Sequence, residues 1–394
     1  MKTNWQTKKL GELVDIVNGF GFPKEYQGSN VGNIPLYKVS DMNLPSNTVY
    51  MYNSNNSVDG QVIERIRARV YPKGTVIFPK IGMAVFTNKK RILTTDSTFD
   101  NNLMGLIPRG INGLFLYYYL LTVDISKLSR ATTMPSISQH DIRKISITFP
   151  DEPVQQQIIE RLDAIRKLQE LNNKEIEKAE ELFETLLDIK FRFNLAYRKF
   201  KLENMVVLKR GPFGGSLKKE IFVPDGYRVY EQRNAINDDF THCRYFITEE
   251  KYKEMADFAV KVGDLIISCS GTIGKVALAP DNVSPGIINQ ALLRITPKRD
   301  IVLGTYLKYL IQSKDMQGKM FGNARGSSIK NIVSIKEIRK IAIHLPPIKE
   351  QQRIVNELDT VKETYEGKVS LQDKLSELFE STLNKAMKGE LVNS

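Results

Sequence analysis

Small residues and a lysine follow an apolar run in the second half of the chain. The segment 268–275 has the sequence SCSGTIGK, and the apolar residues 265–267 precede it. Glycines let a backbone approach a ligand closely, and backbone N–H groups beside a lysine can hold the phosphates of a nucleic acid. The segment does not match a nucleotide-binding phosphate loop, because Cys269 stands where the first glycine belongs and Val276 where Ser or Thr would bind Mg²⁺. It is therefore a candidate contact to a phosphate backbone.

Other basic and amide residues form a wider set of candidate nucleic-acid contacts. Lysine and arginine neutralise phosphates, whereas a side-chain amide can pair with a base edge through two hydrogen bonds. The amide pairs Asn101-Asn102 and Asn289-Gln290 lie at corresponding places in the two halves, which equally fits a structural turn. The predicted DNA contacts are Lys80, Lys89, Lys90, Arg91, Asn101, Asn102, Arg130, Lys209, Arg210, Lys218, Lys219, Ser270, Thr272, Lys275, Asn289, Gln290, Lys319 and Arg325.

Acidic residues near position 250 allow a nuclease hypothesis and a simpler alternative. Asp239 with Glu249 and Lys251 could form a catalytic group. However, Thr248 followed by two glutamates is typical of a helix N-cap with acids in the first helical turn. We favour the N-cap interpretation.

The histidines and cysteines predict no catalytic or metal site. His140, His242 and His344 have no acid or nucleophile at a meaningful spacing. Cys243 and Cys269 cannot build a disulfide framework, and together with the histidines they give no zinc-ligand pattern. We therefore expect a chain without catalytic residues and without a bound metal.

Composition and charge indicate a globular protein with a polyanionic partner. The chain has 394 residues, 41% of them hydrophobic, and a net charge of +12, which suits two or three domains. Residues 1–150 and 194–346 carry +8 and +10, whereas 151–193 and 347–394 carry −4 and −2. We expect 1–150 and 194–346 to be two globular domains, and 151–193 and 347–394 to be the helical segments that follow them. No apolar run is long enough to cross a bilayer and the N-terminus lacks a signal core, so we expect a cytoplasmic protein.

An internal duplication organises these segments. Residues 138–150 (SQHDIRKISITFP) match residues 334–346 (SIKEIRKIAIHLP) at an offset of 196. The match continues without a gap through the glutamine pairs at 155 and 351. Upstream, the segment from Gly74 to Gly82 resembles that from Gly263 to Gly274 less closely. A repeat of this length indicates two copies of one structural unit.

Each acidic segment is predicted to form one long helix, from about Val154 to Ile189 in the first copy. Apolar residues recur at a/d heptad positions, with polar residues in the middle. The positions are Ile158, Leu162, Ile165, Ile176, Ala179, Phe183 and Leu186, and in the second copy Ile354, Leu358, Val361, Tyr365, Leu375 and Phe379. We expect the two helices to pair with each other; the alternative is that each packs on its own neighbouring domain.

The basic segments are predicted to be α+β. Short β-rich runs at 70–71, 75–78, 265–268 and 291–295 are separated by Gly, Pro and Asn turns. Apolar helices are expected at 114–123 and 305–312, and the pairs Ser138 with Asp141 and Ser334 with Glu337 are capping-box signals. The expected fold has two duplicated α/β domains separated by two long helices that pair as an antiparallel coiled coil.

The whole chain resembles the specificity subunit of a type I restriction-modification system. The resemblance rests on two variable domains that each lead into a helix through the pattern Pro-x-x-x-x-Gln-Gln-x-Ile, here at 150–158 and 346–354. It also rests on the run from Gly263 to Lys275. In the first copy Pro79-Lys80 replaces Ser-Gly, and Met83 is aligned with Lys275.

The resemblance implies a DNA-recognition subunit without catalysis of its own. Each domain would recognise one half of a bipartite site on double-stranded DNA, and the helices would set the gap between the halves. Two modification subunits would supply adenine methylation with S-adenosylmethionine, and two restriction subunits would supply ATP- and Mg-dependent translocation and cleavage. This chain would bind no cofactor itself and no membrane.

The sequence leaves open two other classes of protein, an enzyme and a structural scaffold. A free-standing enzyme would need a catalytic group of residues that the sequence does not contain. A coiled-coil scaffold unrelated to DNA would explain the helices but not the two basic domains.

Overall fold

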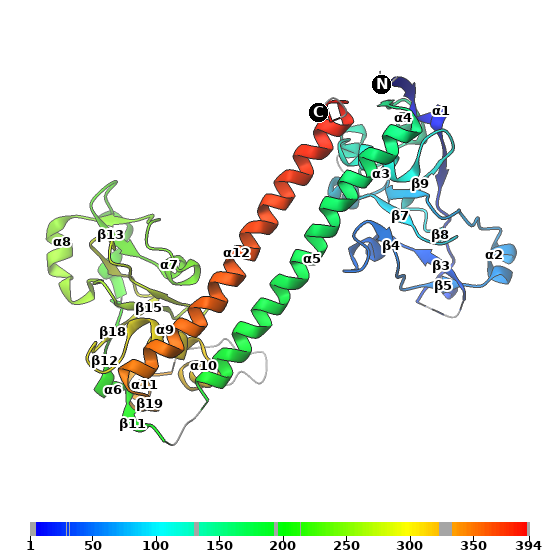
Figure 1. Cartoon of the computed structure of the whole chain (residues 1–394). Helices are drawn as coiled ribbons and strands as arrows, with labels where there is room; N and C mark the ends of the chain where they lie inside the picture. Colours follow the sequence, from blue (N-terminus) through cyan, green and yellow to red (C-terminus); the bar gives the residue numbers. More distant parts are fainter. Residues whose placement is uncertain are drawn as a thin grey trace. The chain divides into compact units, whose positions relative to one another are not determined.

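The computed structural model describes residues 5–28, 30, 32–129, 134–192, 196–212, 214–322 and 333–391. The chain forms two compact units. Unit 1 comprises the residues up to Asn172 together with those from Leu371 onward, and unit 2 comprises Asn173–Ser370. The division crosses both long helices, so each unit contains one α+β domain and half of each helix (Figure 1).

The domain of unit 1 is built on two small sheets. The larger has the strand order β2-β9-β6-β7-β4 and the smaller β5-β3-β8. Their bounds are β2 Val14–Asn18, β9 Leu103–Pro108, β6 Val76–Pro79, β7 Arg91–Leu93, β4 Tyr50–Met51, β5 Ser57–Val58, β3 Ile34–Tyr37 and β8 Thr98–Phe99. The helices are α1 Leu10–Leu13, α2 Gly60–Ile66, α3 Gly113–Leu121 and α4 Gln139–Arg143, with short 3₁₀ helices at Lys24–Tyr26, Val39–Asn43, Met83–Thr87 and Ile125–Leu128.

The domain of unit 2 repeats this order with small changes. Its sheets run β12-β18-β15-β16 and β14-β13-β17. Their bounds are β12 Val206–Arg210, β18 Leu292–Pro297, β15 Leu265–Ser268, β16 Val276–Leu278, β14 Phe246–Ile247, β13 Tyr227–Tyr230 and β17 Gly286–Ile288. The helices are α6 Leu202–Met205, α7 Gln232–Asn237, α8 Glu249–Glu254, α9 Gly304–Gln312, α10 Lys314–Phe321 and α11 Ile335–Lys340, with 3₁₀ helices at Gly214–Leu217, Lys219–Ile221 and Ala256–Phe258.

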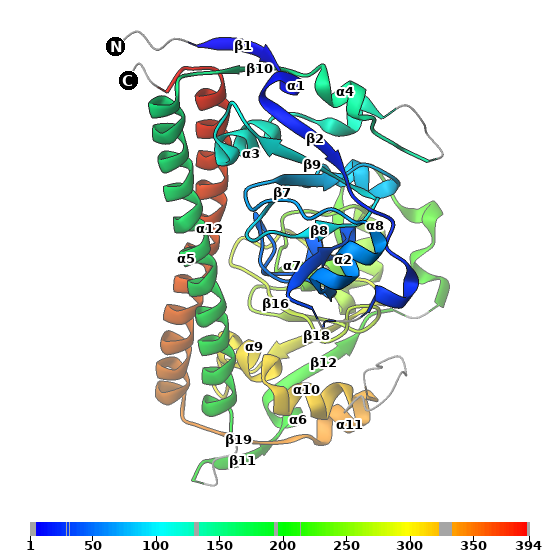
Figure 2. The ribbon, with the colours of Figure 1, turned by 90° about the vertical axis from the view of Figure 1, so that its right-hand side faces the viewer.

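A terminal strand pair closes each domain beside its long helix. In unit 1, β1 (Gln6–Lys9) pairs antiparallel with β10 (Ser146–Phe149), as Figure 2 shows. In unit 2, β11 (Arg198–Lys201) pairs with β19 (Ala342–Leu345) in the same way. Because the second strand of each pair leads directly into a long helix, the pair determines where that helix leaves the domain.

The acidic segments form the two predicted long helices, and the first extends one or two residues beyond its predicted limits. They are α5 (Glu152–Lys190) and α12 (Ile348–Met387). In unit 1 their halves pack antiparallel, because Gln169 Nε2 donates to Ser376 Oγ (3.4 Å) and Asn172 Nδ2 to Gln372 Oε1 (3.0 Å). In unit 2 the halves pack in the same sense, through an ion pair between Lys190 and Glu357 and another, 3.6 Å long, between Lys368 and Glu175. The polar middle of each stripe therefore supplies pairing contacts.

The apolar stripe of each helix contacts both the other long helix and the neighbouring domain. In unit 1, Ile158 and Leu162 of α5 are buried in one cluster with Phe115 and Tyr118 of the domain and with Leu383 of α12. In unit 2, one cluster joins residues of α5, α9 and α12 in the same manner. Helix pairing and packing on the domain are therefore parts of one core in each unit.

Most of the predicted short elements are confirmed, with one difference. Ser138 and Ser334 cap α4 and α11 by accepting the backbone N–H of Asp141 and Glu337. The run at 70–71 forms no strand: Tyr71 makes only an isolated bridge to Ser97. Its ring stacks on Phe99 with centroids 4.5 Å apart, so this residue contributes to the core and not to a strand.

Candidate nucleic-acid interface

A buried glutamine fastens each long helix to its own domain. Gln155 accepts from the Asn112 backbone N–H (3.0 Å) and donates to the Pro150 carbonyl (2.9 Å). Gln351 accepts from the Leu303 N–H (2.9 Å) and donates to the carbonyls of Ile301 (3.0 Å) and Pro346 (2.9 Å). The adjacent glutamines of the two pairs, at 156 and 352, are exposed. Each pair thus has one structural and one solvent-facing member.

A tyrosine–aspartate contact adds to this attachment in both copies. The hydroxyl of Tyr118 on α3 donates to Asp163 on α5, and the hydroxyl of Tyr309 on α9 donates to Asp359 on α12, the latter at 2.5 Å. Burial, and then the carboxylate at the hydroxyl, raise the pKa of both tyrosines far above the ordinary value. Both phenols therefore stay protonated donors. The two helices are held on their domains by equivalent contacts.

The ends of several strands meet at one edge of each domain, which we call the strand-end edge. In unit 1, the N–H of Gly19 after β2 donates to Leu103 (3.1 Å), and the N–H of Lys80 after β6 donates to Asn102 (2.8 Å). The turn Asp100–Asn102 joins β8 to β9 there, and the Asp100 N–H donates to Tyr37 at the end of β3 (2.9 Å).

The strand-end edge of unit 2 has the same backbone hydrogen bonds. The N–H of Gly211 donates to Leu292 (2.9 Å) and that of Cys269 to Ala291 (2.8 Å). The turn Asn289–Ala291 joins β17 to β18, and the Asn289 N–H donates to Tyr230 (3.0 Å). The two edges are therefore equivalent backbones with different side chains.

Each edge requires a glycine at the end of its first strand. A Cβ atom on Gly19 would lie 1.8 Å from the Asp100 carbonyl oxygen, and one on Gly211 would lie 1.8 Å from that of Asn289. No side chain tolerates such contacts with backbone, so glycine alone lets the strand end approach the turn. The close packing of the strand end against the turn therefore depends on this glycine.

A cation lies at each edge, on different strands. In unit 1, Lys80 follows β6 and its ammonium donates to Asn18 Oδ1 at the end of β2 (2.9 Å). In unit 2, the first strand supplies the cation, since Arg210 ends β12 and its guanidinium lies beside Cys269 after β15. Arg210 has a buried terminal nitrogen without a hydrogen-bond partner among the described residues. Each edge therefore has a cation, although the two residues lie on strands that are not equivalent: Lys80 follows β6, whereas Arg210 ends β12, the counterpart of β2.

Comparison with known proteins agrees with this duplicated arrangement. The sequence matches the family described as Type I restriction modification DNA specificity domain twice, over residues 2–181 and 197–376. The chain belongs to this family. The predicted resemblance to type I specificity subunits and the predicted fold class are confirmed.

Individual relatives are distant in sequence but match over nearly their whole length. A putative type I restriction enzyme specificity subunit of Haemophilus influenzae is 24% identical over 89% of this chain and 86% of its own. The type I restriction enzyme EcoBI specificity subunit of Escherichia coli is 20% identical over 99% of this chain and 86% of its own.

Solved structures show the same fold. A type I restriction-modification S subunit from M. genitalium has a TM-score of 0.55 at 15% identity and covers 98% of this chain and 96% of its own. A chain from a structure concerned with complex assembly and conformational transition of the type I R-M system has a TM-score of 0.66 at 16% identity, covering 99% and 100%.

Two predicted contacts, Lys90 and Arg91, use their charged groups for hydrogen bonds within the domain. Lys90 is 1% exposed, and its ammonium donates to Asn88 Oδ1 (2.7 Å) and to the Val123 carbonyl (2.9 Å). Burial lowers its pKa to about 8. Arg91 donates to the carbonyls of Asn47, Lys90 and Met42. Because these groups satisfy buried backbone acceptors, we remove Lys90 and Arg91 from the candidate DNA contacts.

The amide pairs are also separated by the structure. Asn102 donates to the Asp100 carboxylate (3.1 Å) and Asn289 accepts from the Ala291 N–H (3.0 Å). Asn101 and Gln290 are exposed. The alternative of a structural turn therefore applies to Asn102 and Asn289, whereas Asn101 and Gln290 stay predicted base contacts.

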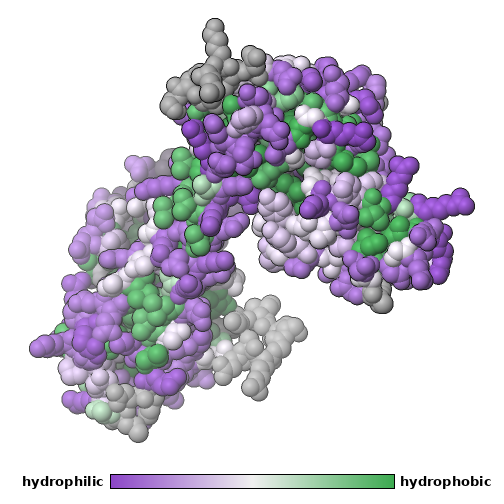
Figure 3. All heavy atoms as spheres, turned by 45° about the vertical axis from the view of Figure 1, so that its right-hand side comes forward, coloured by the Kyte–Doolittle hydropathy of each residue, from purple (hydrophilic) through white to green (hydrophobic). Residues whose placement is uncertain are grey.

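The remaining predicted basic residues are spread over the surface, and on the face drawn in Figure 3 that surface is mainly hydrophilic. Lys209 pairs with Asp257 (2.8 Å) and Lys319 with Asp315 (2.5 Å), while Lys89 donates to Asn43. Lys218 and Lys219 are exposed. These five stay predictions, and the predicted contacts Arg130 and Arg325 lie outside the described residues.

The SCSGTIGK segment of unit 2 has residues near the strand-end edge and a lysine that lines a hollow beside α5. Ser270 donates to Gln232 Oε1 (2.9 Å) next to the strand-end edge, and Thr272 is exposed. Lys275 instead lines a hollow of about 630 Å³ whose wall includes Glu180 and Glu184 of α5. Since Lys275 leads into strand β16 and not into a helix, the arrangement also lacks the helix N-terminus of a phosphate loop.

Strand register corrects the sequence alignment of this segment. Val76 of β6 pairs with Ile92, and the equivalent Leu265 of β15 pairs with Leu278. The offset between the copies thus falls from 189 to 186 across the loop, so the first copy has three extra residues. Lys89, not Met83, therefore corresponds to Lys275.

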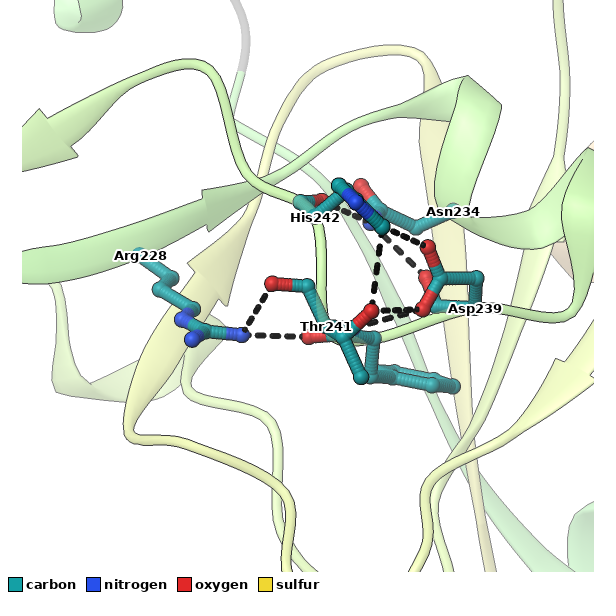
Figure 4. Close-up of polar contacts among 6 residues, drawn as sticks. Arg228, Asn234, Asp239, Thr241 and His242 are labelled. Carbon is teal, nitrogen blue, oxygen red and sulfur yellow. Dashed lines mark hydrogen bonds and ion pairs between the residues drawn. The ribbon is translucent and has the colours of Figure 1, made fainter.

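The acidic residues considered for a nuclease are structural. Thr248 caps α8 by accepting the Lys251 N–H, which confirms the N-cap interpretation of that segment. Asp239 accepts from the Thr241 N–H (2.7 Å) and hydroxyl (2.6 Å) and from His242 Nδ1 (2.9 Å), as Figure 4 shows. These bonds lower the pKa of Asp239 well below its usual range. The carboxylate therefore shapes its own loop.

The described residues show neither a metal-binding cluster nor a membrane-spanning helix. Within the described ranges, no three His, Cys, Asp or Glu residues lie together in a way that could hold a metal ion. None of the described helices is long and apolar enough to cross a membrane.

Proposed function

We propose that this chain is the DNA-specificity subunit of a type I restriction-modification complex, and that each unit recognises one half of a bipartite site. The observation that carries the proposal is the strand-end edge, which occurs twice with the same backbone hydrogen bonds, different side chains and a cation in each unit. A fixed scaffold with variable exposed side chains suits two different half-sites, because phosphate contacts position the DNA while side chains distinguish its bases. The double match to a DNA-specificity family supports it.

The proposal includes the partners expected from the sequence. Two modification subunits would carry S-adenosylmethionine and methylate adenine, and two restriction subunits would carry ATP and Mg. This chain would contribute recognition and no catalytic residue. The names of the relatives, and the fold shared with a chain from the structure concerned with type I R-M complex assembly, support a place in such a complex.

An exchange of domains tests this function. Residues 1–150 are replaced by the corresponding domain of another specificity subunit, and methylated adenines are mapped genome-wide in cells that also express the modification subunits. We expect one half of the methylated site to change and the other half to stay the same. Alteration of both halves, or no methylation that depends on this chain, would contradict the proposal.

The helices provide a second test, of the gap between the half-sites. Four residues are inserted into each long helix at the polar layer, after Asn172 and after Leu371. Such an insertion adds about 6 Å and rotates the following residues by only about 40°, so the apolar stripe keeps its facing. Since DNA rises by about 3.4 Å per base pair, the gap should lengthen by at most about two base pairs. A variant that methylates DNA with the original gap would show that the helices do not set it.

A further inference from the structure

The equivalent turns of the two strand-end edges have three positions with different roles. The first position is Asp100 or Asn289, and its side-chain oxygen accepts the backbone N–H of the third position at 3.0 Å in both units. Its own N–H donates to the carbonyl at the end of the neighbouring strand of the same sheet, that of Tyr37 in β3 or Tyr230 in β13. This residue is occupied in holding the turn.

The third position does not carry a shared side-chain function. It is Asn102 in unit 1, where the amide donates to Asp100 Oδ2 (3.1 Å), and Ala291 in unit 2. What the two residues share is a backbone carbonyl that accepts from the strand end beside it, Lys80 or Cys269. An alanine cannot recognise a base by hydrogen bonds, so this position is also structural.

The middle position is a carboxamide in both units. Asn101 and Gln290 are exposed, and neither side chain has a hydrogen-bond partner among the residues that the structure describes. An amide at this place presents one donor and one acceptor, which is the pattern that pairs with N7 and N6 of adenine in the major groove. The turn beneath it is fixed by the close approach of Gly19 or Gly211. A rigid support limits the entropy lost when such a side chain binds.

We propose that Asn101 and Gln290 are the specificity-determining residues of equivalent position, each recognising an A·T base pair in its own half-site. Lys80 and Arg210 at the same edges would hold the adjacent phosphate backbone. The inference rests on the proposed function and adds to it the two residues and the base-pair type. The duplication makes the assignment stronger than either residue alone, since the copies differ at neighbouring positions and keep an amide here.

Single substitutions in the intact complex test the assignment. Asn101→Ala and Gln290→Ala are each purified with the modification subunits, and DNA is selected from a randomised duplex library. Asn101→Ala should lose about 5- to 150-fold discrimination at one A·T position of one half-site, and Gln290→Ala the same in the other half-site. All other positions should keep their preference. Gln61→Ala and Asn282→Ala, exposed amides elsewhere in units 1 and 2, serve as matched controls and should change nothing.

Each outcome separates this inference from the function on which it rests. If the wild-type complex selects no sequence, the proposed function is wrong. If it selects a bipartite site and both alanine variants keep every preference, only the assignment of the two residues is wrong. A uniform loss of binding to all sequences, or a lowered melting temperature relative to the controls, would also overturn it, because it would indicate a phosphate contact or a structural role.

Discussion

The two ends of each domain differ in what the duplication has preserved. At the end that meets the long helix, both copies keep the side chains: a buried glutamine and a tyrosine–aspartate bond recur with nearly the same partners. At the strand-end edge both copies keep the backbone bonds, whereas the side chains change, as in Lys80 and Cys269. Attachment to a common helix pair demands the same contacts twice, while recognition of two different sequences demands the same frame with different side chains.

The largest effect is expected at the buried glutamines. Gln351→Leu would leave one N–H and two carbonyls without partners, and Gln155→Leu would leave one of each. At about 1–3 kcal/mol for each buried unsatisfied group, Gln351→Leu should lower the free energy of unfolding by roughly 3 kcal/mol or more, and by more than Gln155→Leu. Denaturant unfolding measures this.

The neighbouring glutamines are the controls for that comparison. Gln156 and Gln352 are exposed and make only intrahelical side-chain bonds, to Glu160 and Asn356. Their leucine variants should stay within about 0.5 kcal/mol of the wild type. Equal losses for the buried and the exposed members of a pair would refute the attachment role.

A smaller effect is expected at the tyrosine–aspartate bonds. Tyr309→Phe and Tyr118→Phe each remove a hydrogen bond to a charged group, worth about 1.5–3 kcal/mol. Double-mutant cycles with Asp359→Asn and Asp163→Asn should show a coupling in both units. Coupling in only one unit would mean that the helix attachment is not equivalent in the two copies.

Two lysines of unit 1 allow the strand-end edge to be compared with the interior of the domain. Lys80→Met should weaken DNA binding for all sequences and reduce the slope of log affinity against log salt by about one, because the proposed phosphate contact would be lost. Lys90→Met should leave this slope unchanged, since Lys90 is buried. A salt titration of DNA binding by both variants in the complex measures these slopes. If only Lys90→Met changed the slope, Lys90 and not Lys80 would be the residue that contacts DNA.

The last prediction concerns an effect that is present only at alkaline pH. Burial raises the pKa of Tyr37 and of the equivalent Tyr230 to about 12, and their hydroxyls donate to Met51 and Ser284. An unfolded tyrosine ionises at a pH of about 10, so the folded state should lose stability as pH rises from about 10 to about 12. Tyr37→Phe and Tyr230→Phe should each make that decline less steep. Unchanged steepness in unfolding measured across this range would contradict the prediction.

Local patterns made much of this protein predictable from sequence. The approximate limits of α5, the existence of α12, the caps at Ser138 and Ser334 and the duplication all depend on residues that lie within a few turns of one another or on a direct repeat. Helical periodicity and N-capping are properties of the chain segment itself, so tertiary structure had little to change.

The candidate contacts needed tertiary structure, because burial and hydrogen bonding join distant segments. Lys89 and Lys90 are alike in sequence, yet Lys90 is buried by bonding to the carbonyl of Val123, 33 residues away. Asn101 and Asn102 likewise have identical side chains, but the turn leaves that of Asn101 exposed and places that of Asn102 against Asp100. The neighbouring strands hold this turn through backbone hydrogen bonds. The sequence alone determined that this chain is basic and duplicated. Which of its charged and amide side chains are exposed, and which are used in hydrogen bonds within the domain, was decided only by the packing of its strands.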